Sequence, residues 1–306
     1  MTVSIVIATR DRREDLRRTL SELSRLDPKP LEILICADGC TDGTAEMVRR
    51  EFPACLLLQN DIPRGSVPSR DRMMRAASGE FVLSLDDDSH PVAADFLARA
   101  VAVMGSHPEA AVITFPELRD GGAFASERLA EGARGHYVGA YPNCSALMRR
   151  CVYLQCSGFP PAFFHMYEEP DYALQCYAAG HAVWFEPACV IRHHRSASNR
   201  SSFRAHQLNA RNEMWSVWLR CPWPWLPVVA LFRAWRQLRY AATEGLYWAL
   251  REPVWWLSAL RGAVWCIRLR KRVRWAIYYE WMNLARKPAF DIDELERRFP
   301  GIDARA

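Results

Sequence analysis

Three consecutive aspartates, Asp86 to Asp88, directly follow the apolar run 81–85. This run has the length and low charge of a buried strand, and Gly79 ends the helix expected before it. Adjacent carboxylates repel one another and are costly to bury unpaired. At the carboxyl end of a buried strand they favour a hard divalent cation, Mg²⁺ or Mn²⁺, bridging them to a diphosphate. A solvated acidic turn is the alternative.

Strand-like and helix-like segments alternate through the first half of the chain. Apolar runs at 3–8, 31–37, 56–58 and 81–85 are separated by segments with helical spacing, which predicts an α/β fold with a mostly parallel sheet. The second run ends at Asp38, so two strands deliver carboxylates to one sheet edge, as in a nucleotide site. Asp38 could instead be a turn residue before glycine, and Arg70 either a phosphate ligand or half of a surface salt bridge.

The first residues and the cysteine pattern indicate the cellular compartment in which the protein is expected. Residues 1–7 enter a strand-like pattern with no basic segment before it, so we expect no export signal and a cytoplasmic protein. The ten cysteines lack the paired spacing of a zinc site, and reduced thiols are expected.

Four segments taken together, 3–12, 37–44, 70–71 and 79–88, resemble glycosyltransferase family 2. The resemblance covers about residues 3–215 and implies a GT-A fold and a nucleotide-diphosphate sugar donor. Ala37 and Cys40 depart from the family's usual aspartate and serine. Asp86 and Asp88 are implied as metal ligands, and the implied donor-binding residues are Thr9, Arg10, Asp38, Arg70, Asp86 and Asp87.

A second acidic cluster contains Glu168, Glu169 and Asp171, with Pro170 inside it. Proline suits the first turn of a helix, so we expect Glu169 just before a helix, in extended backbone that aims its carboxylate outward. The resemblance implies that this cluster supplies the catalytic base, with Glu169 preferred, Glu168 as the rival and Asp171 nearby. The alternative is that all three acids merely cap a helix.

The strand expected at 189–192 ends in two histidines, His193 and His194. A histidine at such a position is commonly a satisfied polar residue. The family places a metal-binding histidine here, so the resemblance implies His193 as a ligand, with His194 second. An imidazole beside carboxylates suits Mn²⁺ better than Mg²⁺.

The last third of the chain has a different composition. Residues 1–194 carry 20 Lys and Arg against 26 Asp and Glu, a net charge of −6, whereas residues 195–306 carry 20 against 9, a net of +11. Eleven of the twelve tryptophans lie between Trp215 and Trp281. The longest uncharged run in this part, 221–232, has 12 residues, too few for a spanning helix of ~20 residues. Basic, aromatic helices favour a peripheral position on a membrane with anionic headgroups; a helical domain packed on the catalytic domain or a partner is the alternative.

These observations define one expected organisation. Residues 1–212 form a GT-A catalytic domain, 213–286 an amphipathic membrane-associating helical extension, and 287–306 a polar, loosely ordered tail. Residues 117–138 are weakly patterned and suit a loop over the substrate. We expect Asp38, Asp88, Glu169 and His193 to meet around one cation at one rim of the sheet.

The expected function is inverting transfer of a hexosyl or deoxyhexosyl group. The donor is a nucleotide-diphosphate sugar, and the acceptor is a hydroxyl of a glycan or lipid-linked glycan at the inner face of the cell membrane. Nucleic acid is not an expected partner, because the acidic front half repels phosphates that no metal holds. A nucleotidyltransferase and a non-catalytic membrane-bound scaffold are the alternatives.

Overall fold

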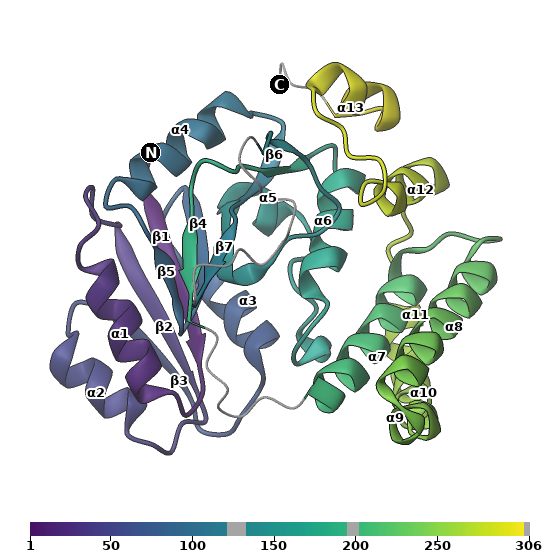
Figure 1. Cartoon of the computed structure of the whole chain (residues 1–306), viewed down its shortest axis with the longest axis horizontal. Coiled ribbons are helices and arrows are strands. Elements are labelled where there is room, and N and C mark those ends of the chain that lie inside the picture. Colours follow the sequence, from purple (N-terminus) through teal and green to yellow (C-terminus); the bar gives the residue numbers. More distant parts are fainter. Residues whose placement is uncertain (121–132, 195–201, 303–306) are drawn as a thin grey trace.

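The computed structural model describes residues 1–120, 133–194 and 202–302. A central sheet with helices on both sides forms one part, and a group of helices lies beside it (Figure 1). The strands are β1 (Val3–Thr9), β2 (Glu32–Asp38), β3 (Leu56–Asn60), β4 (Phe81–Asp86), β5 (Ser89–Pro91), β6 (Ala110–Thr114), β7 (Glu117–Arg119), β8 (His136–Tyr137), β9 (Ala146–Arg149), β10 (Ala182–Phe185) and β11 (Ile191–His193).

The helices of the sheet region include two short 3-10 turns. They are α1 (Arg13–Leu23), α2 (Thr44–Glu51), α3 (Ser66–Ala76), α4 (Phe96–Ser106), η2 (Asn143–Ser145), α5 (Arg150–Gln155), η3 (Pro161–Phe163) and α6 (Glu168–Ala178). The helices of the last third are α7 (Ser202–Arg220), α8 (Leu226–Glu244), α9 (Leu246–Leu250), α10 (Glu252–Arg261), α11 (Ala263–Arg268), α12 (Trp275–Asn283) and α13 (Ile292–Arg298).

The central sheet has the order β3-β2-β1-β4-β9-β6-β10-β8. Strands β3, β2, β1 and β4 are parallel neighbours, and β9 runs antiparallel between β4 and β6. The predicted α/β fold with a mostly parallel sheet is confirmed. Because parallel strands end at the same edge, β1, β2 and β4 bring Thr9, Asp38 and Asp86 to one rim.

A small second sheet, β5-β11-β7, continues from that rim. Its middle strand β11 pairs antiparallel with β5, so that His193 lies opposite Ser89. It pairs in parallel with β7, so that Ile191 lies opposite Glu117. This sheet carries the predicted histidine back to the turn that follows β4. Residues 121–132 of the predicted loop lie outside the described residues.

Apolar residues of the strands form the core. Ile5, Ile35 and Leu83 are fully buried, and helix α3 packs against β1 and β2 while α6 packs against β10. Strand β6, which our sequence analysis did not recognise, is buried along its whole length. Its sequence, Ala-Ala-Val-Ile-Thr, has no polar and apolar alternation, as expected for a strand whose two faces are both buried.

Helix α7 joins the sheet region to the rest of the chain. Helices α8, α10 and α11 pack against α7, forming the group of green helices beside the sheet in Figure 1. The predicted domain boundary at 212 falls in the middle of α7. Among the described residues, none of the helices combines the length and apolar character needed to cross a bilayer.

The prediction of a loosely ordered tail at 287–306 is wrong for the described part, 287–302. Asp291 caps α13 by accepting a hydrogen bond from the Glu294 amide at 2.8 Å. Leu295 and Phe299 are buried, and the Phe299 ring stacks on Tyr177 with the ring centroids 4.5 Å apart. The apolar residues of this short helix lie one turn apart, which is enough to bury one face against the catalytic part.

Candidate active site

Two carboxylates and one imidazole meet where β4 ends. The side-chain ligand atoms of Asp86, Asp88 and His193 lie within 4.8 Å of one another. Nε2 of His193 lies 3.1 Å from Asp88 and 3.8 Å from Asp86, while Nδ1 is bonded to Glu117 at 2.8 Å. This donor set fits a divalent cation such as Mn²⁺, and the Glu117 contact orients the imidazole as carboxylates do behind metal-binding histidines.

The protonation of this cluster reflects its crowded negative charge. Although burial opposes the shift, hydrogen bonds with Asp88 and Glu117 raise the pKa of His193 to about 9. Burial also opposes ionisation of Asp88, yet His193 and Arg12 hold its pKa well below the ordinary range. The cluster thus attracts positive charge, whether a proton on the imidazole or a bound cation.

The middle aspartate, Asp87, has a separate environment. It accepts hydrogen bonds from Thr9 at 2.8 Å and from Arg12 at 2.6 Å. Burial raises the pKa of Asp87 to about 7, in spite of the Arg12 charge. Arg12 also donates to Asp88 at 2.5 Å, so it joins two members of the triplet. Our sequence analysis did not select Arg12, although it lies three residues after the first strand-end threonine.

Arg70 links the metal cluster to the second acidic cluster. From α3, this buried guanidinium contacts Asp86 and lies 3.6 Å from Oε1 of Glu168. Asn143 donates to the same Glu168 oxygen at 3.0 Å. Glu168 is 2% exposed, so its side chain is packed and paired. Arg70 is therefore part of a buried ion-pair network and not of a surface salt bridge, and its role as a phosphate ligand stays a prediction.

Glu169 occupies the accessible side of this network. Helix α6 begins at Glu168, so the expectation that Glu169 precedes the helix is wrong; Glu169 lies in the first turn, and Pro170 follows within that turn. Its carboxylate is half-buried and lies 3.4 Å from the Asn143 amide nitrogen. Desolvation, together with the neighbouring Glu168 charge, raises the pKa of Glu169 to about 8. Of the two glutamates, Glu169 is the one a substrate can reach.

Asp171 lies apart from this pair. Its fully buried carboxylate accepts from Ser216 at 2.7 Å and Gln175 at 2.8 Å, and forms a salt bridge with Arg220 at 3.0 Å. All of its close partners lie on α6 itself and on α7. This geometry gives Asp171 a structural role in joining the two helices, and we do not retain it as a candidate base.

Three other predicted residues lie around the rim. Asp38 accepts from the backbone amides of Arg64 and Gly65 at 2.8 Å. Neither Asp38 nor Glu169 belongs to the cation cluster, so the predicted meeting of all four residues at one ion is wrong for these two. Arg10 is exposed and faces Asp11 at 3.8 Å. The His194 side chain contacts Asp120 and His90, whereas its backbone amide donates to the Asp88 carbonyl at 2.8 Å.

The loop 163–167 leads into α6 and its two glutamates. Phe164, Met166 and Tyr167 have φ values of 65°, 76° and 71°, a left-handed backbone that is strained for such residues. The Asn212 side-chain amide of α7 holds this loop by donating to the carbonyls of Phe163, His165 and Met166 at 2.8 to 3.0 Å. The loop that precedes the candidate base therefore depends on a residue of α7.

The architecture is that of GT-A glycosyltransferases. The chain is similar to mannosyltransferase PcManGT from Pyrobaculum calidifontis, in complex with GDP-Man and Mn²⁺, with 18% identity, 86% of this chain and 87% of that chain covered, and a TM-score of 0.57. It is also similar to S. aureus TarS in complex with UDP-GlcNAc, with 16% identity, coverage of 94% and 88%, and a TM-score of 0.61. At these identities the likeness establishes the fold.

The family follows from the sequence match. Residues 4–154 match the model of glycosyl transferase family 2, and the chain belongs to this family of enzymes. A UDP-Glc:alpha-D-GlcNAc-diphosphoundecaprenol beta-1,3-glucosyltransferase of Escherichia coli is 26% identical over 89 residues. That alignment covers 29% of this chain and 36% of the relative's length.

The raised pKa of Glu169 predicts a pH-dependent stability difference. Between its ordinary pKa of 4.5 and about 8, the unfolded chain has lost this proton while the folded chain keeps it. Folding then takes up a proton, so the wild type loses stability as the pH rises. Glu169→Gln cannot ionise and should melt higher than the wild type at pH 8, with little difference at pH 5, in calorimetry at both pH values. The exposed Glu46→Gln is the control, and an equal difference at both pH values would contradict the assignment.

Proposed function

We propose that this protein transfers a hexosyl or deoxyhexosyl group, with inversion, from a nucleotide-diphosphate sugar to a hydroxyl of a glycan or lipid-linked glycan. The observation that carries the proposal is the chain of contacts Asp88–His193–Asp86–Arg70–Glu168, which ends beside the accessible Glu169. It joins a cation-attracting cluster to a carboxylate of raised pKa on one rim. Donor chemistry and base chemistry thus lie side by side, as a single displacement requires.

Glu169 is the proposed base. Its ionised carboxylate takes the proton of the acceptor hydroxyl as that oxygen bonds to the anomeric carbon, while the bond from that carbon to the diphosphate oxygen breaks. The products are the glycosylated acceptor, a nucleoside diphosphate and protonated Glu169. Inversion is what the family resemblance implies for one displacement. Glu168, buried against Asn143 and Arg70, positions the turn that carries Glu169.

Asp86, Asp88 and His193 are the proposed holders of Mn²⁺ or Mg²⁺. The two carboxylates and the imidazole converge, and Glu117 fixes the ring from behind. When bound there, the ion would offset the negative charge that develops on the leaving diphosphate. Arg12, which contacts both Asp87 and Asp88, holds the triplet in place. Asp38 shapes the loop at Arg64 and Gly65, beside which we place the nucleotide.

The base assignment predicts a separation of binding from transfer. Glu169→Gln should lower the transfer rate by roughly 100- to 10,000-fold, the usual contribution of a positioned base, because it cannot accept the proton. Its affinity for the donor should be unchanged, since the cation cluster is intact. Single-turnover transfer and nucleotide-sugar titration measure the two quantities, with Glu46→Gln as control. Full activity in Glu169→Gln would reject the base, and release of pyrophosphate by the wild type would favour a nucleotidyltransferase.

We further propose that helices α8 to α11 hold the enzyme on the inner face of the cell membrane, next to a lipid-linked acceptor. Leu231, Leu246, Leu250 and Ile267 on these helices are each more than 70% exposed. A surface of this kind is rarely left to water. The exposed basic residues of the same part are suited to anionic headgroups: Arg239, Arg251, Arg261, Arg268, Lys271, Arg272 and Arg274.

Vesicle flotation tests the membrane proposal. The wild type should float with vesicles of phosphatidylcholine and phosphatidylglycerol and less with phosphatidylcholine alone, because both apolar burial and charge contribute. The double variant Leu246→Glu, Leu250→Glu should stay in solution. Ile62→Glu, the same change at an exposed residue of the sheet region, is the control and should still float. A wild type that remains in solution with both kinds of vesicle would overturn the proposal.

A further inference from the structure

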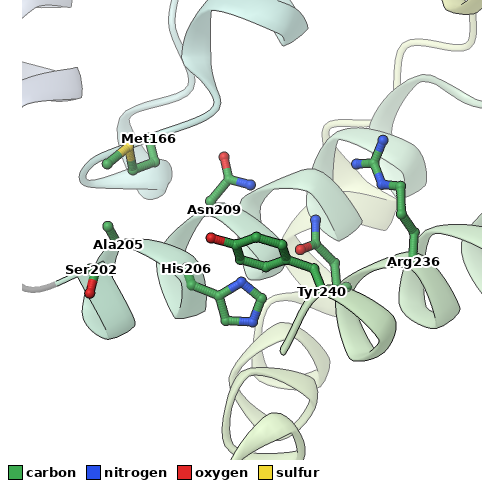
Figure 2. A pocket seen from close by; sticks show the side chains of 8 residues that line it. Met166, Ser202, Ala205, His206, Asn209, Arg236 and Tyr240 are labelled. Carbon is green, nitrogen blue, oxygen red and sulfur yellow. The ribbon is translucent and has the colours of Figure 1, made fainter. Parts of the chain in front are cut away.

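A pocket of about 550 Å³ lies between helices α7 and α8, and none of the groups assigned to the proposed reaction lines it. Figure 2 shows Met166 near one end and Arg236 near the other, with the side chains of His206, Asn209 and Tyr240 between them. Its volume is in the range of small-molecule sites, ~300–1,000 Å³.

The lining suits a ligand that both donates and accepts hydrogen bonds. Asn209 and Gln237 supply amides, Tyr240 a hydroxyl on an aromatic ring, and Arg236 a cation. Among the described residues, the Asn209 side chain forms no hydrogen bond, and Tyr240 is 48% exposed, so both can meet a ligand. Sugar rings offer hydroxyls that donate and accept, together with apolar faces that rest on aromatic rings.

The other polar side chains of the pocket are fixed by partners behind it. Nε2 of His206 bonds to Glu252 at 2.7 Å, and Gln237 donates to Glu213 at 2.5 Å. Glu213 also pairs with Arg233 and Arg236, so this corner keeps one positive charge in excess. The pocket wall is thus preorganised by buried contacts, and it needs no rearrangement to present polar atoms.

The loop 163–167 lies between this pocket and the start of α3, which adjoins the donor rim. On one side, the Phe164 carbonyl accepts from the Val67 amide at 3.1 Å, and His165 bonds to Ser66 at 2.7 Å, at the start of α3. On the other side, Asn212 of α7 holds the loop, and Met166 lines the pocket. Met166 precedes Glu169 by three residues, so a chain-like ligand whose hydroxyl meets Glu169 can continue across Met166 into the pocket.

We propose that the pocket between α7 and α8 is a subsite for a saccharide unit of the acceptor, next to the unit that receives the transferred sugar. This inference rests on the proposed function and names part of its acceptor. The strained backbone of Phe164, Met166 and Tyr167 sets the course of the acceptor between base and subsite. Because the pocket lies on the helices that carry the exposed apolar surface, a saccharide bound there would be held between membrane and base.

Saturation-transfer NMR with methyl glycosides tests the subsite directly. The probes are the methyl β-glycosides of glucose, galactose and N-acetylglucosamine, added to the full chain with UDP and Mn²⁺. At least one should bind the wild type. Asn209→Ala and Tyr240→Ala should each raise its Kd by about tenfold, the effect of one lost polar or stacking contact. Thr243→Ala, which removes an exposed hydroxyl one turn further along α8, is the matched control and should bind like the wild type.

UDP binding in the same samples separates the possible failures. If neither UDP nor GDP, tested with Mn²⁺, binds the wild type, the proposed function itself fails. If UDP binds all variants equally but no glycoside binds, or glycosides bind Asn209→Ala and Tyr240→Ala as tightly as the wild type, the subsite is overturned. Weaker glycoside binding accompanied by weaker UDP binding also contradicts it, because the pocket shares no side chain with the donor rim.

Discussion

Carboxylates crowded at one sheet edge are the constraint on which the site depends. Asp87, Asp88 and Glu168 are buried, and each needs positive charge or hydrogen-bond donors to stay folded. Arg12 forms ion pairs with Asp87 and Asp88, and Arg70 forms ion pairs with Asp86 and Glu168. The two arginines come from different elements, the turn after β1 and helix α3, and they fix where the acids point.

This distribution of cations also separates roles among similar side chains. Burial and the neighbouring Glu168 charge raise the pKa of Glu169, and among the described residues no cation forms an ion pair with it. Its neighbour Glu168 is packed and paired with Arg70. The carboxylates of Asp86 and Asp88 instead lie within 4.8 Å of the His193 imidazole. Acidic side chains are thus suited to hold a cation at one place and proposed to accept a proton at another, because their contacts differ.

The last third of the chain is part of the site's construction. Asn212 holds the loop before the two glutamates. Arg220 forms a salt bridge with Asp171 in the first turn of α6, the helix that carries both glutamates. Both residues lie on α7, which continues past the expected boundary at residue 212. The helices proposed to meet the membrane are therefore attached to the helix that positions the base, which gives a physical route from membrane contact to catalytic geometry.

Local patterns predicted the parts of the structure that local chemistry determines. The apolar runs of β1, β2 and β4, and the acids that end two of them, were readable because strand burial and strand ends leave short signals. Asp171 was selected because it lies in the acidic cluster that the family resemblance marks. Its structural role depends on Arg220, 49 residues away, which no local pattern reveals. Arg12 was missed for the same reason. Strand β6 was missed because its run is short and begins with two alanines, which are uncommon in strands. Helix α13 was missed because one buried turn is a weak signal in a polar tail.

Asp86, Asp88 and His193 are proposed to form one cation site beside the proposed base. Titration of the full chain with Mn²⁺ in the presence of UDP, followed by electron paramagnetic resonance, measures it directly. His193→Ala should weaken Mn²⁺ binding by about 10- to 100-fold, as loss of a ligand or its support does, while His194→Ala, at the adjacent histidine, should leave it unchanged. Equal effects of the two substitutions, or undiminished Mn²⁺ binding in His193→Ala, would show that these three residues do not form the cation site.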